Sequence, residues 1–158
     1  MNKIIIGAIG LILIVAAALL YRGTDQFTAG VTEQPEMPAP AQPHTPTLTT
    51  NGPLSQQLVL TAPAAQQVAK KFTVSGEAPG PWYFEASFPI FVTDVQDNKI
   101  ATSYGQAQGD WMTESLVPFT AQIDVGTYTG PATVHLLRDN PSGMPENDDA
   151  ASFQVVIQ

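Results

Sequence analysis

The sequence contains no cysteine and little basic charge, and each shortage argues against a class of protein. Without cysteine there is no disulfide framework, no thiolate metal site and no lipid-modified cysteine, so any attachment to a membrane has to come from the protein itself. Six Lys and Arg residues against fourteen Asp and Glu residues give a net charge of −8. Because no basic cluster could neutralise a row of phosphates, we predict no nucleic-acid binding.

Histidine is also scarce, and the chain offers few groups for catalysis. Its two histidines are His44, in a proline-rich stretch, and His135, on the outward phase of an expected strand. A nucleophilic hydroxyl would need a base beside it, and a zinc site would need several imidazole or thiolate ligands. Glu77 and Glu85 are a conceivable carboxylate pair, but nothing in the sequence places them in a common cleft. We therefore predict that the protein is not an enzyme.

What is present begins with an apolar segment. Ile4–Tyr21 contains no charged residue, and as a helix it would be about 27 Å long, close to the hydrocarbon thickness of a bilayer. We predict that residues 1–22 form a transmembrane anchor that contacts the lipid bilayer. A cleaved signal peptide is the alternative, because Ala16-Ala17-Ala18 offers small residues, although Leu19-Leu20 continue the apolar run past them.

Residues 23–56 predict a flexible proline-rich linker. Their prolines recur without apolar periodicity, and such a segment cannot bury enough surface to offset its ordering entropy. A proline-rich docking motif is the alternative, but no basic residue accompanies the prolines. The tail before the anchor is very short, and the stretch after it is acidic. We therefore expect the C-terminal domain, residues 57–158, on the extracytoplasmic side of the cell membrane.

The domain alternates between strand and turn patterns. In the longest run, Trp82–Val95, the apolar residues Phe84, Ala86, Phe88, Ile90 and Val92 fall at every second position. This period predicts one strand with a buried face and a wet face. The same alternation recurs in the runs that end at Gly76, Val125, Leu136 and Ile157. About seven short strands separated by turns predict an all-β, antiparallel β-sandwich.

Aromatic residues near the turns suggest a binding platform. Trp82, Tyr83 and Trp111 are candidate residues for holding a sugar ring or a partner protein. The alternative is that Trp111 plugs one end of the sandwich. Phe91 falls on the outward phase of its run, so it is either covered by Gly105–Leu116 or part of a small exposed apolar patch.

The acidic stretch Asp139–Asp149 is the one candidate metal site. Asp139, Glu146, Asp148 and Asp149 would supply hard oxygen ligands of the kind that calcium prefers. The spacing matches no EF-hand, so a hydrated loop is the alternative. Calcium is the only cofactor that the sequence suggests.

Several short motifs, taken in order, are similar to those of a known family. They are Ala62-Pro63, Val74-Ser75-Gly76-Glu77-Ala78, Phe84-Glu85-Ala86-Ser87-Phe88, Gly109-Asp110-Trp111, Pro118-Phe119 and the stretch Asp139–Asp149. Over about Leu58–Gln158 the chain resembles the immunoglobulin-like domain of bacterial spore-germination proteins, the Gmad family. The resemblance implies an immunoglobulin-like sandwich on the outer side of a bacterial membrane, with a role in binding or assembly. We expect its partner to be a protein or a cell-wall glycan. It supplies no catalytic residues and does not imply germination itself.

Overall fold

The computed structural model describes residues 45–158, and their regular structure consists of strands and three-residue 3₁₀ helices. No helix in this part of the chain is long and apolar enough to cross a bilayer. The anchor predicted for residues 1–22, and the linker as far as residue 44, lie outside the described residues. The strands are β1 (Thr49–Thr50), β2 (Val59–Ala62), β3 (Gln67–Val68), β4 (Lys71–Pro79), β5 (Ser87–Thr93), β6 (Lys99–Ala107), β7 (Leu116–Asp124), β8 (Gly130–Leu137) and β9 (Ala150–Ile157), and the 3₁₀ helices are η1 (Ser55–Gln57), η2 (Gly80–Trp82) and η3 (Pro145–Asn147).

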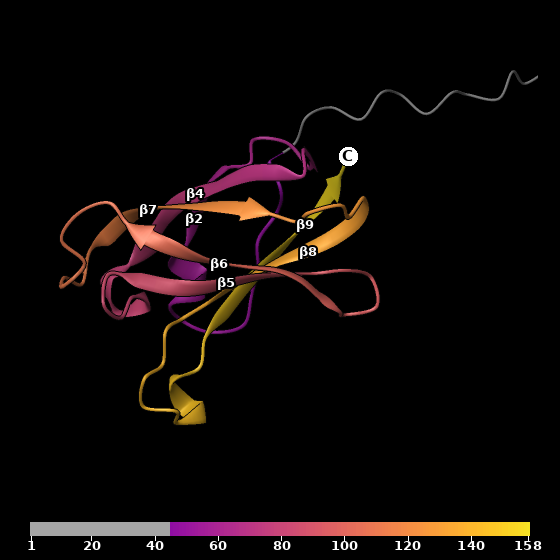
Figure 1. Cartoon of the computed structure of the whole chain (residues 1–158). Helices are drawn as coiled ribbons and strands as arrows, with labels where there is room; N and C mark the ends of the chain where they lie inside the picture. Colours follow the sequence, from indigo (N-terminus) through magenta and orange to yellow (C-terminus); the bar gives the residue numbers. More distant parts are fainter. Residues whose placement is uncertain (1–44) are drawn as a thin grey trace, which may run out of the picture. The chain divides into compact units, whose positions relative to one another are not determined.

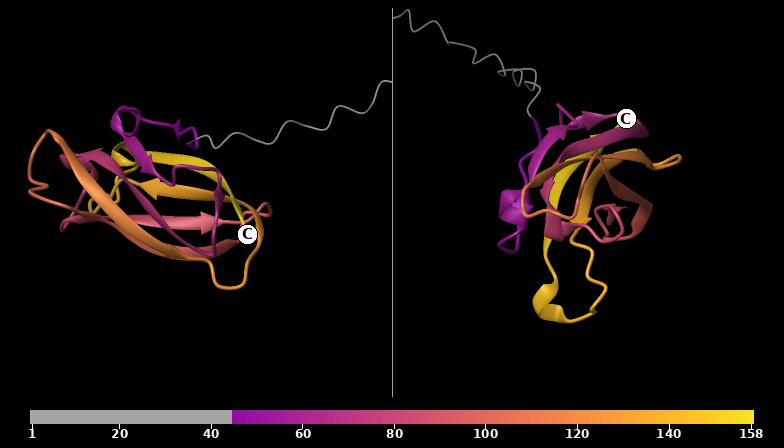
Figure 2. Two further views of the ribbon diagram at one scale, coloured as in Figure 1. Left: turned by 90° about the horizontal axis from the view of Figure 1, so that it is seen from above. Right: turned by 90° about the vertical axis from the view of Figure 1, so that its left-hand side faces the viewer.

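The strands form one curled sheet in the order β1-β9-β8-β5-β6-β7-β4-β2 (Figure 1). Every pair is antiparallel except the short β3, which runs parallel to the end of β9. β6 makes the corner, because it pairs with β5 along its length but with β7 only at Gln106 and Ala107. The loop between β8 and β9 projects away from the sheet, as the right-hand view of Figure 2 shows. The antiparallel all-β prediction is confirmed, with nine strands rather than about seven.

The two halves of the curled sheet pack against each other through the inward side chains of alternate strand positions. Phe88 of β5 and Phe119 of β7 meet edge to face, with their ring centres 5.0 Å apart. The inward phases expected for β4, β7, β8 and β9 are confirmed, because one buried cluster contains Phe72, Val74, Phe119, Ala121, Ile123, Val134, Leu136, Phe153, Val155 and Ile157. Alternation therefore predicts most of the core.

The expected uninterrupted strand from Phe84 is wrong at its start. Glu85 and Ala86 form a two-residue turn with φ angles of 49° and 61°, closed by two backbone hydrogen bonds between Phe84 and Ser87. β5 begins only at Ser87, so Phe88 is fully buried whereas Phe84 is 42% exposed. Because the turn reverses the chain, the period of two does not extend across it.

The sandwich begins earlier in the chain than residue 57, where the sequence placed the end of the linker. Thr49 and Thr50 pair with β9, and the Asn51 N–H donates to the Ala150 carbonyl at 3.1 Å. Ser55, in η1, is fully buried. The segment from Thr49 onward therefore belongs to the sandwich, although its composition resembles that of the proline-rich stretch before it.

Candidate functional site

The outer face of the β9-β8-β5-β6 half carries an aromatic stack. The rings of Phe91 and His135 lie parallel, 4.5 Å apart between centres, and the Lys99 ammonium lies 4.6 Å from the centre of the Phe91 ring. His135 Nε2 and the Thr93 hydroxyl are 3.0 Å apart. Burial lowers the pKa of His135 below its ordinary value, against the opposing effect of the Asp97 carboxylate. Phe91 is thus partly covered by His135 and Lys99 rather than by Gly105–Leu116.

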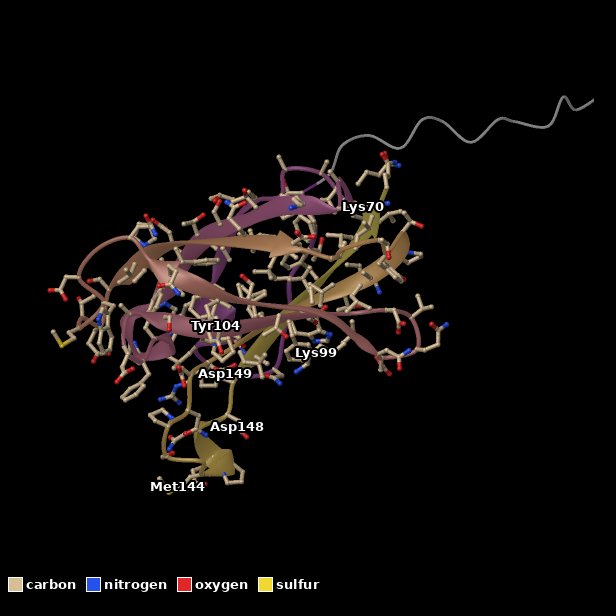
Figure 3. All side chains as sticks on the ribbon, viewed as in Figure 1. Lys70, Lys99, Tyr104, Met144, Asp148 and Asp149 are labelled. Atoms are coloured by element: carbon tan, nitrogen blue, oxygen red, sulfur yellow. The ribbon has the colours of Figure 1, made fainter. Side chains whose placement is uncertain are left out.

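A polar groove adjoins this stack along β8 and β9. It is lined by Thr47, Thr49, Gln66, Thr133, Ser152, Phe153 and Gln154, and its volume is about 380 Å³. Because Ser152 pairs with His135 and His135 pairs with Phe91, one row of outward side chains leads from the groove to the stack. The row continues to Thr102 on β6, and the neighbouring Tyr104 is 54% exposed (Figure 3).

The three aromatic residues expected to form a platform lie in two environments. Trp82 is fully buried and Tyr83 nearly so, and both rings contact Phe88 edge to face. The Tyr83 hydroxyl donates to the Val117 carbonyl at 2.8 Å, and burial raises the pKa of this hydroxyl. Their ring faces are packed inside the protein and are not available to a surface ligand. Trp111 is half-buried and packs against the core, as expected of a residue that closes one end of the sandwich.

The acidic residues of the β8–β9 loop do not converge. Figure 3 shows Met144 at the tip of the loop, Asp148 partway along it and Asp149 at its base. Asp148 Oδ1 accepts from the Asn140 side chain at 2.7 Å, whereas Asp149 Oδ2 accepts from the backbone N–H groups of Leu54 and Ser55. Among residues 45–158, no three His, Cys, Asp or Glu side chains lie close enough to hold a metal ion together.

Asp139 and Glu146, the other two candidate ligands, lie in separate parts of this loop. The Asp139 N–H donates to the Trp82 carbonyl at 3.0 Å, while Glu146 is exposed in η3. Burial, and to a smaller extent the nearby Glu85 carboxylate, raise the pKa of Asp139 above its ordinary value. Arg138 fixes the start of the loop, because its guanidinium donates to the carbonyls of Pro81 at 3.1 Å and Asn147 at 2.9 Å.

The geometry of this loop predicts that calcium does not stabilise the fold. We expect equal thermal unfolding midpoints in millimolar calcium and in excess chelator, because the Asp149 carboxylate already binds Leu54 and Ser55 inside the protein. Circular dichroism at one wavelength measures both midpoints. A midpoint that rises with calcium, and does not rise when Asp139 and Glu146 are changed to Asn and Gln, would restore the metal site.

The curled antiparallel sheet and its single core define an immunoglobulin-like β-sandwich. A family model described as the immunoglobulin-like domain of bacterial spore germination, Gmad2, matches residues 57–145, more than half of the chain. The chain belongs to this family, and the resemblance inferred from its motifs is confirmed. The match ends before β9, which completes the sheet beside β8. No curated protein and no solved structure matches the chain.

Sequence reasoning missed the groove as a site. Thr47 and Thr49 fall in the stretch interpreted as linker, and Gln66 follows a turn, so no local pattern connects them. The sequence offered one indication of the groove: Thr133, Ser152 and Gln154 all fall on the outward phase of their strands, and all three are polar and uncharged. Such residues are common on any wet sheet face, so the signal becomes specific only when the register is known.

Proposed function

We propose that this protein is a non-catalytic binding or assembly module of the bacterial cell envelope. The observation that carries the proposal is its membership of an immunoglobulin-like family over residues 57–145. Sandwiches of this type present loops and sheet faces to partners, and their function resides in those surfaces rather than in the fold. The outer face with the Phe91–His135 stack and its adjoining groove is such a surface.

The chemistry of the described residues supports a binding role over catalysis. His135 is the histidine in this part of the chain, and its Nε2 atom is engaged by the hydroxyl of Thr93, a buried residue, at 3.0 Å. A general base needs access to a substrate proton within hydrogen-bond reach. The carboxylates of Asp139 and Glu85 influence each other, but Glu85 is exposed on a tight turn and therefore solvated rather than held in a cleft.

The apolar segment Ile4–Tyr21 supports an extracytoplasmic location. Its length and lack of charge fit a single bilayer crossing, and the proline-rich stretch that follows would hold the sandwich away from the lipid surface. A net charge of −8 suits a soluble surface outside the membrane. The partner would then be an envelope protein or a cell-wall glycan.

A membrane-impermeant, amine-reactive cross-linker tests both parts of this proposal in intact cells that produce the full chain. Lys70, Lys71 and Lys99 are all exposed. Lys71 begins β4 and Lys99 begins β6, and Figure 3 shows Lys70 and Lys99 well apart on the molecule. We expect these lysines to be modified in sealed cells, and part of the protein to move to higher mass as cross-linked adducts. A cytoplasmic protein serves as the control and should react only after lysis.

The two outcomes are separable. Lysines that react only after lysis would contradict the extracytoplasmic location. Lysines that react in sealed cells without forming any adduct, even at high reagent concentration, would contradict the binding role, because no envelope component would lie within reach.

A further inference from the structure

The groove on β9 occupies a break between two short edge strands. β1 pairs with Ala151 and Ser152, and β3 pairs with Val156 and Ile157, so neither covers Phe153–Val155. The opening between them is walled by Thr47 and Thr49 on one side and by Gln66 on the other. A smaller hollow shares Gln66, Thr133 and Gln154 with this groove and extends it toward Val95, Pro131 and Val156. Together the two adjoining hollows make up a depression across β8 and β9.

Every side chain that lines this depression is uncharged, although the whole chain carries a net charge of −8. A charged ligand would lose hydration here without gaining a partner of opposite charge. The polar groups are the hydroxyls of threonine and serine and the amides of glutamine, which can each donate and accept hydrogen bonds. This lining suits a neutral ligand that is itself rich in hydroxyl and amide groups.

An extended peptide fits the same place less well. Peptide addition to a sheet edge needs a free edge several residues long. Here β1 and β3 already pair with β9 on both sides of the gap, so a longer peptide strand would collide with one or the other. A ring-shaped unit can enter the gap from the outer face, where the row through Ser152 leads to the stacked rings of His135 and Phe91. Binding sites commonly combine apolar surface with a few placed polar groups in this way.

We infer that the groove lined by Thr49, Gln66, Thr133, Ser152 and Gln154 binds a neutral glycan chain, with one sugar unit in the gap between β1 and β3. The inference rests on the proposed binding role and names the class of ligand. Gln154 and Thr133 contact the sugar from the floor of the groove, and Thr49 and Gln66 contact it from the two walls. The next sugar unit lies beside Ser152 and His135, at the end of the row that borders the groove.

Isothermal titration of the full chain with chitohexaose, a neutral N-acetylated oligosaccharide, tests this inference. The chain is kept in a zwitterionic detergent, because a detergent with a sugar headgroup would compete for the groove. We expect saturable binding that Gln154→Ala and Thr133→Ala each weaken about two- to tenfold, the effect of losing one hydrogen bond. Gln106→Ala is the matched control, because Gln106 is also an exposed strand glutamine, on β6 and away from the groove, and should leave binding unchanged.

Two further probes identify the chemistry that is recognised. Cellohexaose has the hydroxyls but not the acetamido groups, so binding of both sugars supports recognition through hydroxyls, and binding of chitohexaose alone supports recognition of the amide. Trialanine tests the peptide alternative. Circular dichroism melting of each variant excludes unfolding as the cause of weaker binding.

Three results would overturn the inference. They are no binding of either sugar at millimolar concentration, equal weakening by Gln106→Ala and Gln154→Ala, and displacement of the sugar from the groove by trialanine. If neither sugar binds while the intact-cell experiment still yields cross-linked adducts, the neutral-glycan site is wrong and the broader binding role stands.

Discussion

Replacing Phe88 with alanine is expected to lower the free energy of unfolding by about 3–5 kcal/mol, the usual cost of removing a buried aromatic ring. Phe88 is fully buried, and three rings pack edge-on against it: Trp82 at 6.2 Å, Tyr83 at 5.3 Å and Phe119 at 5.0 Å between centres. These neighbours come from η2, from the residue after it and from β7. The substitution therefore removes a contact that joins the two halves of the curled sheet.

Urea unfolding followed by tryptophan fluorescence measures this change, and Phe84→Ala is its matched control. Phe84 lies four residues earlier in the same aromatic run but is 42% exposed, so its loss should cost less than about 1.5 kcal/mol. Equal effects of the two substitutions would contradict the turn at Glu85-Ala86 and restore the uninterrupted strand.

Gly105 provides a second control for the same contact. A β-carbon at Gly105 would lie 2.3 Å from Cζ of Phe88, so Gly105→Ala should be destabilising in the natural protein. In the Phe88→Ala background the ring is gone, and the added methyl group can occupy part of the vacated space. We therefore expect the double variant to be more stable than the sum of the single effects predicts, as contacting residues usually show.

The same pair of phenylalanines indicates what sequence can and cannot predict for this fold. Phe88, Ile90 and Val92 were predictable because a period of two is a direct consequence of strand geometry. Phe84 was not, because the two-residue turn uses Glu85 and Ala86 at positive φ, where glycine or asparagine would be the usual signal. A turn made by residues that rarely form it leaves no mark in a single sequence.

The burial of Trp82 was predicted wrongly and the groove was not predicted at all, because both environments are created by distant segments. Trp82 follows a Pro-Gly-Pro turn and looks exposed locally, but η2 is held against the loop before β7 by a hydrogen bond from the Gly80 N–H to the Ser115 carbonyl. In the same way the walls of the groove come from positions 47–49 and 66, while its floor comes from β8 and β9. Alternation identifies which side chains face outward, but not which outward side chains become neighbours.

Replacing Asp149 with alanine is the second large effect we expect, a loss of about 2–4 kcal/mol in the free energy of unfolding. Asp149 is 5% exposed, and its Oδ2 atom accepts from the N–H groups of Leu54 at 2.8 Å and Ser55 at 3.1 Å. Hydrogen bonds to a charged group contribute about 1.5–3 kcal/mol each, and removing the acceptor leaves buried N–H groups unsatisfied. The residue therefore fastens the segment before β2 to the start of β9.

Asp148→Ala is the matched control for this effect, and Gly52→Ala tests its mechanism. Asp148 is the adjacent carboxylate, but it is exposed and accepts only from Asn140, so its loss should change stability by less than about 1 kcal/mol. A β-carbon at Gly52 would lie 2.5 Å from the Asp149 carboxyl carbon, so Gly52→Ala should displace that carboxylate and destabilise the natural protein. In the Asp149→Ala background the added methyl group meets no carboxylate, and Gly52→Ala should cost much less. Additive costs in urea unfolding, or equal costs for Asp148 and Asp149, would show that the fold does not depend on this contact.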